Sequence, residues 1–137
     1  MSTSTLNLGP VRRDPTTERF FAATAVREFP ICRCTECGAV GGPQETQCPA
    51  CGSNTLSWDV ASGRAVVRSF IVNHRRTTAG EPAERTVVVI GELEEGPWWW
   101  AQVADVDPET LSEGDHLTID FAPSGDELVP IFRPDRT

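Results

Sequence analysis

The sequence predicts a mainly β protein with one helix near its N-terminus. Two observations predict this class. All five cysteines fall between Cys32 and Cys51, where they form two closely spaced pairs and one extra residue. From Ser62 onward the chain consists of short runs rich in β-branched and aromatic residues, separated by turn signals such as Gly96-Pro97. At 137 residues the chain is one compact domain, or one small domain with an appendage.

The first part of the chain predicts a flexible segment followed by a helix. Residues 1–13 lack the apolar stretch of a signal peptide, and we expect them to be flexible. A helix is predicted to begin at Asp14-Pro15, because aspartate caps helices well and proline suits the first turn. We expect the helix to run to about residue 27 and its lead-in to reach residue 31. The apolar face of this helix is predicted to hold Phe20, Phe21, Ala25 and Val26.

The cysteines predict a metal site. Two CxxCG sequences are joined by ten residues, one beginning at Cys34 and the other at Cys48. Two residues between thiolates bring both sulfurs to one face of a tight turn, and the following glycine allows the positive φ that such a turn often needs. Two such turns can close a tetrahedral four-sulfur site for Zn²⁺. The predicted ligands of this zinc ribbon, which spans residues 32–60, are Cys34, Cys37, Cys48 and Cys51.

The fifth cysteine, Cys32, precedes Cys34 by two residues, and CxC spacing does not make the tight turn of the two pairs. We interpret Cys32 as a small buried side chain beside the site, in preference to a ligand. Four sulfurs leave no open coordination position, so the predicted role of the zinc is structural. An iron site of the rubredoxin type uses similar spacing, and the sequence leaves zinc and iron open.

Residues 61–134 predict a barrel of five strands, with a helical turn capped near Asp107 before the fourth. Polar and apolar residues alternate over 116–121, so one face of that strand is expected to be buried. This order favours a small Greek-key barrel of the OB type, and a sandwich of five or six strands is the alternative. The five predicted strands are AVVRSFIVNH, RTVVVIGELE, WWWAQVAD, HLTIDFA and LVPIFRP.

Charge and composition exclude several classes of function. The formal net charge is −8, and four thiolates around one Zn²⁺ would make it more negative by two. A protein this acidic repels a phosphate backbone, so we expect no nucleic acid as a partner. No apolar run approaches the length that spans a membrane, and we expect a cytoplasmic protein whose thiols stay reduced. No catalytic triad, carboxylate pair or phosphate-binding glycine loop can be assembled, so no catalysis is predicted.

Aromatic residues are the candidates for contacts with a partner. In a strand, the first and third residues of Trp98-Trp99-Trp100 face one side and the second faces the other. One side is expected to be core, and at least one of these tryptophans is a candidate interface anchor. Phe20 and Phe21 are expected to pack on the ribbon, and docking on a partner is the alternative.

The ordered set of helix, ribbon, junction and barrel resembles the DUF35 family, in which zinc ribbons of the rubredoxin type are fused to an OB fold associated with acyl-CoA. The matching motifs are the CxxCG and CPxCG pairs, the W-x-x-x-SG junction that begins at Trp58, L-x-x-GD-x-L-x-I-D-F over residues 111–121, and P-I-F over 130–132. The resemblance covers about residues 14–134. It departs from the family's pattern before the second pair, where VGGPQETQ replaces an aromatic-Pro-Pro-Arg stretch, and at the junction, where Gly-x-Gly is missing.

The resemblance implies a non-catalytic accessory subunit that binds a thiolase-fold enzyme: a thiolase, an acyltransferase, or a retro-aldolase of steroid side-chain breakdown. It also implies acyl-CoA at the interface and, for some members, a MaoC-type hydratase as a further partner. In that context Arg75 and Arg76 are candidates to receive a CoA phosphate, and balancing the acidic surface is their alternative role. Two other functions stay open, which are a nucleic-acid-binding module of OB fold and ribbon, and a small rubredoxin-like electron carrier.

Overall fold

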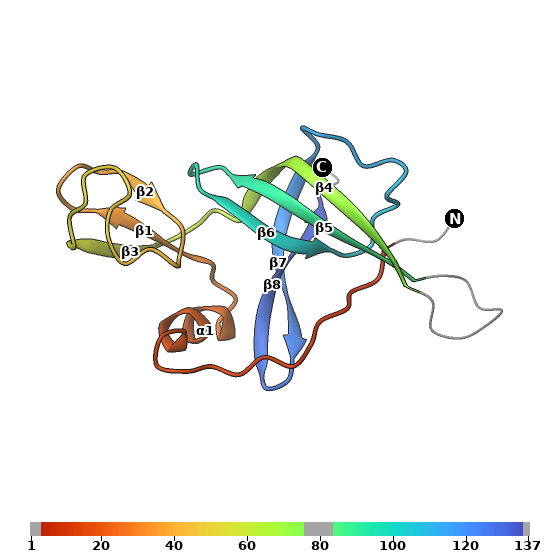
Figure 1. Cartoon of the computed structure of the whole chain (residues 1–137), viewed down its shortest axis with the longest axis horizontal. Coiled ribbons are helices and arrows are strands. Elements are labelled where there is room, and N and C mark those ends of the chain that lie inside the picture. Colours follow the sequence, from red (N-terminus) through yellow and green to blue (C-terminus); the bar gives the residue numbers. More distant parts are fainter. Residues whose placement is uncertain (1–3, 76–83, 136–137) are drawn as a thin grey trace.

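The computed structural model describes residues 4–75 and 84–135, with the side chain of residue 75 left undescribed. Figure 1 shows a small lobe that carries the cysteines at one end of the molecule, a larger lobe of long strands at the other end, and a short helix beside them. In the described residues the elements are α1 (Glu18–Ala25), β1 (Pro30–Cys34), β2 (Val40–Gly41), β3 (Leu56–Val60), β4 (Arg64–Arg75), β5 (Glu84–Leu93), β6 (Trp98–Val103), β7 (His116–Ser124) and β8 (Glu127–Pro134).

The larger lobe is a closed barrel with the strand order β4-β5-β6-β8-β7. Its neighbours are antiparallel except for β6 and β8, which meet in parallel at a single position, Val103 opposite Phe132. The five predicted strands are therefore present in the predicted order, and the closed barrel decides against a sandwich. The predicted helical turn before the fourth strand is a single turn, in which the N–H of Thr110 donates to the carbonyl of Asp107 over 3.0 Å.

Alternation along the strands fills the barrel. Val87, Val89 and Val103 point inward and are fully buried, as is Phe132 from β8. Gly91 continues the inward row of β5, and a Cβ atom at this position would lie 2.8 Å from Cζ of Phe132. The phenyl ring thus occupies the space that a side chain at residue 91 would take. A core this densely filled is typical of a small OB-type barrel.

The ribbon is a three-stranded sheet with the order β2-β1-β3. The chain before and within β1 ties this sheet to the barrel, because Phe29 and Ile31 belong to the same buried cluster as the barrel's inward residues. The backbone continues this attachment, since the N–H of Ala61 donates to the carbonyl of Phe29 over 2.9 Å. The ribbon therefore shares its base with the barrel core, although its tip holds little apolar mass of its own.

Helix α1 is shorter than predicted. Asp14 does not cap it directly; its carboxylate accepts from the N–H of Thr17 over 2.9 Å and so stabilises a turn that precedes the helix. The helix ends early because Arg27 adopts a positive φ of 60°, and the N–H of Glu28 then returns to the carbonyl of Ala23 over 3.0 Å. Val26 lies on this turn and is 66% exposed. The predicted apolar face is therefore wrong at Ala25 and Val26, which are exposed, while Phe21 and Thr24 are buried.

The N-terminal segment differs from the flexible arm that we expected over residues 1–13. Within its described part, the Ser4 hydroxyl donates to the carbonyl of Val103 over 2.7 Å, and Thr5 N–H donates to the carbonyl of Arg85 over 2.9 Å. Further along, Val11 forms a bridge with Gly125 at the β7–β8 turn. These bonds hold residues 4–11 against the outside of the barrel. In the described residues no helix is long and apolar enough to cross a membrane.

Candidate metal centre and surface sites

The two cysteine turns have the same backbone geometry. In the first turn, the N–H of Gly38 donates to the carbonyl of Cys34 over 2.9 Å; in the second, Gly52 donates to Cys48 over the same distance. Both glycines have a positive φ, 80° and 79°, which explains why glycine follows each pair. This repeated local structure is what the CxxCG spacing predicts. It points two sulfurs of each turn toward the space between the turns.

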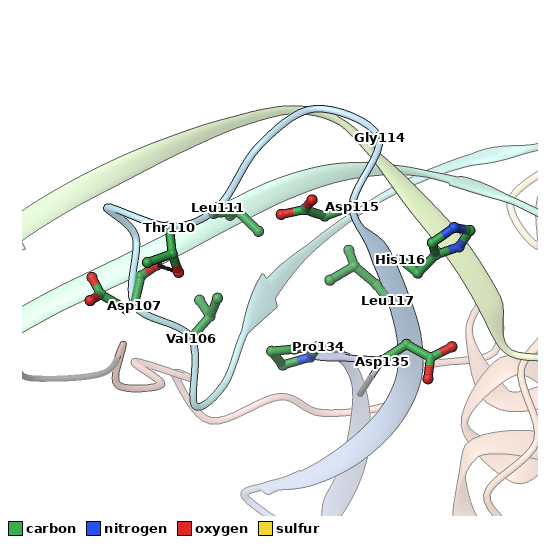
Figure 2. Close-up of a pocket in the computed structure, with 10 residues that line it drawn as sticks. All are labelled: Val106, Asp107, Thr110, Leu111, Gly114, Asp115, His116, Leu117, Pro134 and Asp135. Carbon is green, nitrogen blue, oxygen red and sulfur yellow. Dashed lines mark hydrogen bonds between the residues drawn. The ribbon is translucent and has the colours of Figure 1, made fainter. Parts of the chain in front are cut away.

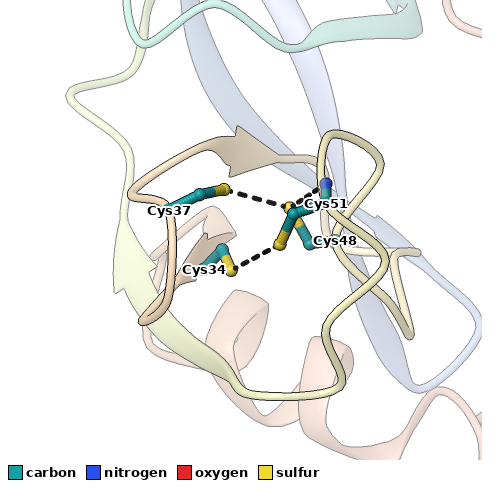
Figure 3. A group of neighbouring side chains, drawn as sticks. All are labelled: Cys34, Cys37, Cys48 and Cys51. Atoms are coloured by element: carbon teal, nitrogen blue, oxygen red, sulfur yellow. Dashed lines mark hydrogen bonds between the residues drawn. The ribbon is translucent and has the colours of Figure 1, made fainter.

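The four sulfurs converge on one point (Figure 3) and all lie within 4.8 Å of one another. The Sγ atoms of Cys34 and Cys51 are 3.7 Å apart, and those of Cys37 and Cys48 are 3.5 Å apart. A tetrahedral zinc site with Zn–S bonds of about 2.3 Å requires sulfur–sulfur distances of about 3.8 Å. The four side chains therefore fit a zinc ion, and the contribution of a bound zinc would be structural because four sulfurs fill its coordination sphere.

Backbone N–H groups prepare two of the sulfurs for the anionic form. The N–H of Cys51, helped by that of Ala50, lowers the pKa of Cys48 to about 6 against the opposing effect of burial. The N–H of Cys37 likewise lowers the pKa of Cys34. For Cys51, the N–H of Ser53 lowers the pKa, but the neighbouring sulfurs and burial together raise it to about 12. The first cysteine of each turn thus ionises more readily, and a bound cation would deprotonate the second ones as well.

Cys32 stands apart from this group. It lies on β1, is 1% exposed, and its Sγ is 4.0 Å from the carbonyl oxygen of Glu45. Burial raises the pKa of its thiol, so the neutral form is favoured. Cys32 is therefore a small buried residue of β1 that does not belong to the four-sulfur group.

The candidate aromatic residues divide into two groups. Phe20 packs between Phe21, at a ring-centroid distance of 5.3 Å, and Trp99, at 5.8 Å. Trp99 also meets Phe29, with ring centroids 4.9 Å apart. These four rings join the helix, the lead-in to the ribbon and the barrel. Phe21 is 6% exposed, so its ring packs inside this chain and offers little surface to a partner.

Trp98 and Trp100 point the other way and are 56% and 68% exposed. The predicted alternation is therefore confirmed: Trp98 and Trp100 face one side of β6, and Trp99 faces the other. A contact that the sequence did not suggest holds Trp98, whose indole N–H donates to Glu92 over 3.1 Å. Arg68 pairs with the same carboxylate oxygen over 2.7 Å. Only the register of β5 against β6 and β4 brings these three side chains together.

A second contact that the sequence missed joins the helix to the ribbon. The guanidinium carbon of Arg19 lies 4.5 Å from the centroid of the Trp58 ring, a cation–π geometry. The two residues are far apart along the chain and share no motif. Their contact depends on where α1 sits against β3.

The arginines predicted to receive a CoA phosphate are not placed by the structure. Arg75 ends β4 opposite Glu84, with its side chain undescribed, and Arg76 lies outside the described residues. Their role stays a prediction. At the opposite end of β4, Arg64 pairs with Glu94 over 3.0 Å, so its charge already has a carboxylate partner.

A cleft of about 600 Å³ lies at the end of the barrel, beside the loop between β6 and β7 (Figure 2). Its polar lining includes Asp107, Asp115, His116 and Asp135. The Asp107 carboxylate accepts from the N–H of Glu109 over 3.0 Å, and Asp115 accepts from the N–H of Ser112 over 2.9 Å. Two of the acids therefore stabilise the loop that carries them. The concentration of carboxylates makes this cleft a poor site for a phosphate group.

Comparison with known proteins agrees with this architecture. Residues 58–122 match the family model described as the C-terminal OB-fold domain of ChsH2. Three archaeal relatives are each named a DUF35 domain-containing scaffold protein. The one from Methanothermobacter thermautotrophicus is 31% identical over 90 residues, which make up 65% of this chain and 68% of that protein. The protein from Pyrococcus furiosus is 32% identical over 53% of both chains, and that from Methanocaldococcus jannaschii is 34% identical over 60% of this chain and 59% of its own.

Two solved structures share the fold over most of their length. A chain of the structure described as the Ltp2-ChsH2(DUF35) aldolase aligns with a TM-score of 0.75 and 28% identity, covering 90% of this chain and 96% of that one. A DUF35 protein of unknown function from Sulfolobus solfataricus aligns with a TM-score of 0.66 at 14% identity, covering 88% and 86%, and shows the fold alone. The class defined by these features is a four-cysteine ribbon joined to an OB-type barrel. This chain belongs to the DUF35 family.

Proposed function

We propose that this chain is a non-catalytic accessory subunit that acts as a scaffold for a thiolase-fold enzyme working on an acyl-CoA. The observation that carries the proposal is the near full-length match, at 28% identity, to a chain of the Ltp2-ChsH2(DUF35) aldolase. The archaeal relatives are named scaffold proteins, which supports a role in holding other polypeptides together.

The chemistry of the described residues supports a scaffold over an enzyme. Four of the five thiols meet in a cluster with the geometry of a closed metal site, and Cys32 is buried in the core. Of the two histidines of the sequence, His74 is exposed on β4, and His116, exposed at the start of β7, lines the cleft without a side-chain hydrogen bond to any other described residue. General acid–base or nucleophilic catalysis requires such groups to be paired with one another in a cleft.

The way in which the lobes are joined also suits a scaffold. The ribbon shares its base with the barrel core through Phe29 and Ile31, and the aromatic contacts of Phe20 and Trp99 fix the helix to the barrel. A partner that binds such a surface orders few side chains on binding, so less conformational entropy is lost.

The experiment is to purify the tagged chain from its native host, identify co-purifying proteins by mass spectrometry, and produce the thiolase-fold subunit found there with and without the chain. We expect the two proteins to co-elute in gel filtration. A stable interface buries more than about 1,000 Å² of accessible surface, and a complex of that kind stays together on the column. Acyl-CoA turnover should require the enzyme and should fall when the chain is omitted, while the chain alone should show no turnover. A subunit that is soluble and fully active alone, and elutes separately from the chain, would contradict the proposal.

The same purified complex tests the finer parts of the hypothesis. Acyl-CoA retained at the interface would be released on denaturation and detected by mass spectrometry. A MaoC-type hydratase would appear as a third polypeptide at constant ratio to the other two. Both rest on the family resemblance, and the nature of the acyl group follows from the substrate that the partner turns over.

A further inference from the structure

Strand β6 has an open edge at its beginning. On one side it pairs with β5 along its whole length, with Trp98 opposite Glu92 and Val103 opposite Val87. On the other side it pairs with β8 only at its last residue, Val103, which lies opposite Phe132. The N–H of the next residue, Ala104, donates to the carbonyl of Phe132 over 2.9 Å. Among the described strands, none pairs with residues 98–101 on that side.

The open edge exposes the backbone groups of two particular residues. The N–H of Leu93 donates to the carbonyl of Pro97 over 2.8 Å, so Leu93 and Pro97 form a hydrogen-bonded pair between β5 and the start of β6. In antiparallel strands such pairs alternate with residues whose N–H and C=O point away. Trp99 and Ala101 therefore bond to β5, whereas Trp98 and Trp100 direct their backbone groups to the open side. No backbone hydrogen bond from another described segment reaches these two residues.

The same two residues carry the most exposed aromatic side chains. Trp98 and Trp100 are 56% and 68% exposed, which corresponds to about 300 Å² of accessible surface for the two residues together. One side of a stable protein interface covers about 800 Å², so these two rings would supply over a third of it. The Trp98 ring is already held by its hydrogen bond to Glu92, so little rotamer freedom remains to be lost on binding.

An apolar groove of about 430 Å³ runs beside the open edge, between β6 and β8. Its walls are formed by three elements, the helix, β6 and β8, and by the N-terminal segment, with Val88 and Ser124 completing the lining. The N-terminal segment is tied to β6 by two hydrogen bonds between the backbone of Asn7 and the side chain of Gln102. The lining from these three elements is Phe20, Phe21, Trp99, Trp100, Ala101, Gln102, Val129 and Pro130. The groove offers apolar contacts directly next to backbone groups that need donors and acceptors.

We propose that this open edge of β6 accepts an extended segment of the partner subunit as an additional strand, with apolar side chains of that segment lying on Trp98 and Trp100. The inference rests on the proposed function. Backbone groups two residues apart, about 7 Å along the strand, match the repeat of another β-strand. The segment should be uncharged or basic, because the whole chain carries a formal net charge of −8. Glu92 and Glu94 beside the strand add little to this preference, because they already pair with Arg68 and Arg64.

Side-chain substitutions test the apolar contact. The affinity of the purified thiolase-fold subunit for the chain is measured by calorimetry with Trp98→Ala and Trp100→Ala, and each is expected to weaken binding about tenfold or more. The matched control is Val26→Ala, which removes an equally exposed apolar side chain at the end of the helix and should leave the affinity unchanged. If both tryptophan variants bind like the unmodified chain, the inference is wrong while the proposed function stands.

Amide hydrogen exchange tests the backbone contact without any substitution. Read at single-residue resolution, the amides of Trp98 and Trp100 should exchange rapidly in the free chain and slowly in the complex. Those of Trp99 and Ala101 should be slow in both, because they bond to β5. A complex in which the first two amides gain no protection overturns the added strand. Protection of the same amides in a homodimer of this chain would overturn the choice of partner, and a chain that binds no thiolase-fold subunit would overturn both proposals.

Discussion

Substitution of Gly91 by alanine is expected to destabilise the barrel through one identifiable clash. The added Cβ would lie 2.8 Å from Cζ of Phe132 and 3.2 Å from its Cε2, closer than carbon atoms approach in folded proteins. The phenyl ring is fully buried and surrounded by the barrel core, so it has no free space to move into.

The size of the effect follows from two opposing contributions. Overpacking a filled core costs about 1–3 kcal/mol. Replacing glycine with alanine also restricts the unfolded chain, which stabilises the folded state by about 0.4–1 kcal/mol. The expected net loss in the free energy of unfolding is about 1–2 kcal/mol, a substantial part of the ~5–15 kcal/mol that holds a typical domain together.

The assay is urea denaturation at a fixed zinc concentration, because bound metal contributes to the apparent stability. A double-mutant cycle isolates the clash. Phe132→Leu shortens the ring side chain, so the double variant should be about 1 kcal/mol more stable than the sum of the single effects predicts. Gly9→Ala is the matched control, because nothing lies within 4 Å of a Cβ built at that position. A Gly91→Ala variant as stable as the unmodified protein, or strictly additive effects in the cycle, would refute the packing argument.

Three further predictions concern the metal site, an ion pair and nucleic acid. The purified chain should contain one zinc ion per molecule by elemental analysis. The Cys48→Ser variant should lose the metal, and the Cys32→Ser variant should keep it. A red protein with visible absorption would indicate iron instead. Arg133 donates to Asp120 over 2.5 Å, and this hydrogen bond lowers the pKa of the Asp120 carboxyl. The pair therefore stabilises the fold above the unfolded-state pKa of about 3.9. This stabilisation is lost as the pH falls through the lower folded-state pKa. The difference in urea midpoint between the unmodified chain and Asp120→Asn should therefore be present at pH 6 and shrink below pH 4; a difference independent of pH would contradict it. Single-stranded DNA or RNA should bind no more tightly than ~10⁻⁴ M at physiological salt, and micromolar binding that weakens with added salt would show this expectation to be wrong.

The sequence by itself determined the features whose causes are local. Each CxxCG pair specifies its own turn, because the glycine with positive φ and the backbone bonds that shape the turn all lie within five residues. The five barrel strands were predictable for a similar reason, since alternation of apolar residues reflects one buried face along each strand. Their order, together with the ribbon, was sufficient to indicate the family.

Only the tertiary structure decided what depends on contacts between distant residues. The sequence shows that the three tryptophans of β6 alternate between two faces. Which face is buried depends on Phe20 and Phe29, which pack on Trp99. The open edge of β6 exists because β8 meets it at one residue pair, and no local pattern encodes where two strands diverge. The helix ended earlier than its propensities suggested, because Arg27 turns the chain toward the ribbon with a positive φ that few side chains favour. For the tryptophans and for the open edge, the conformation is fixed by contacts between separate elements, which a linear sequence does not display.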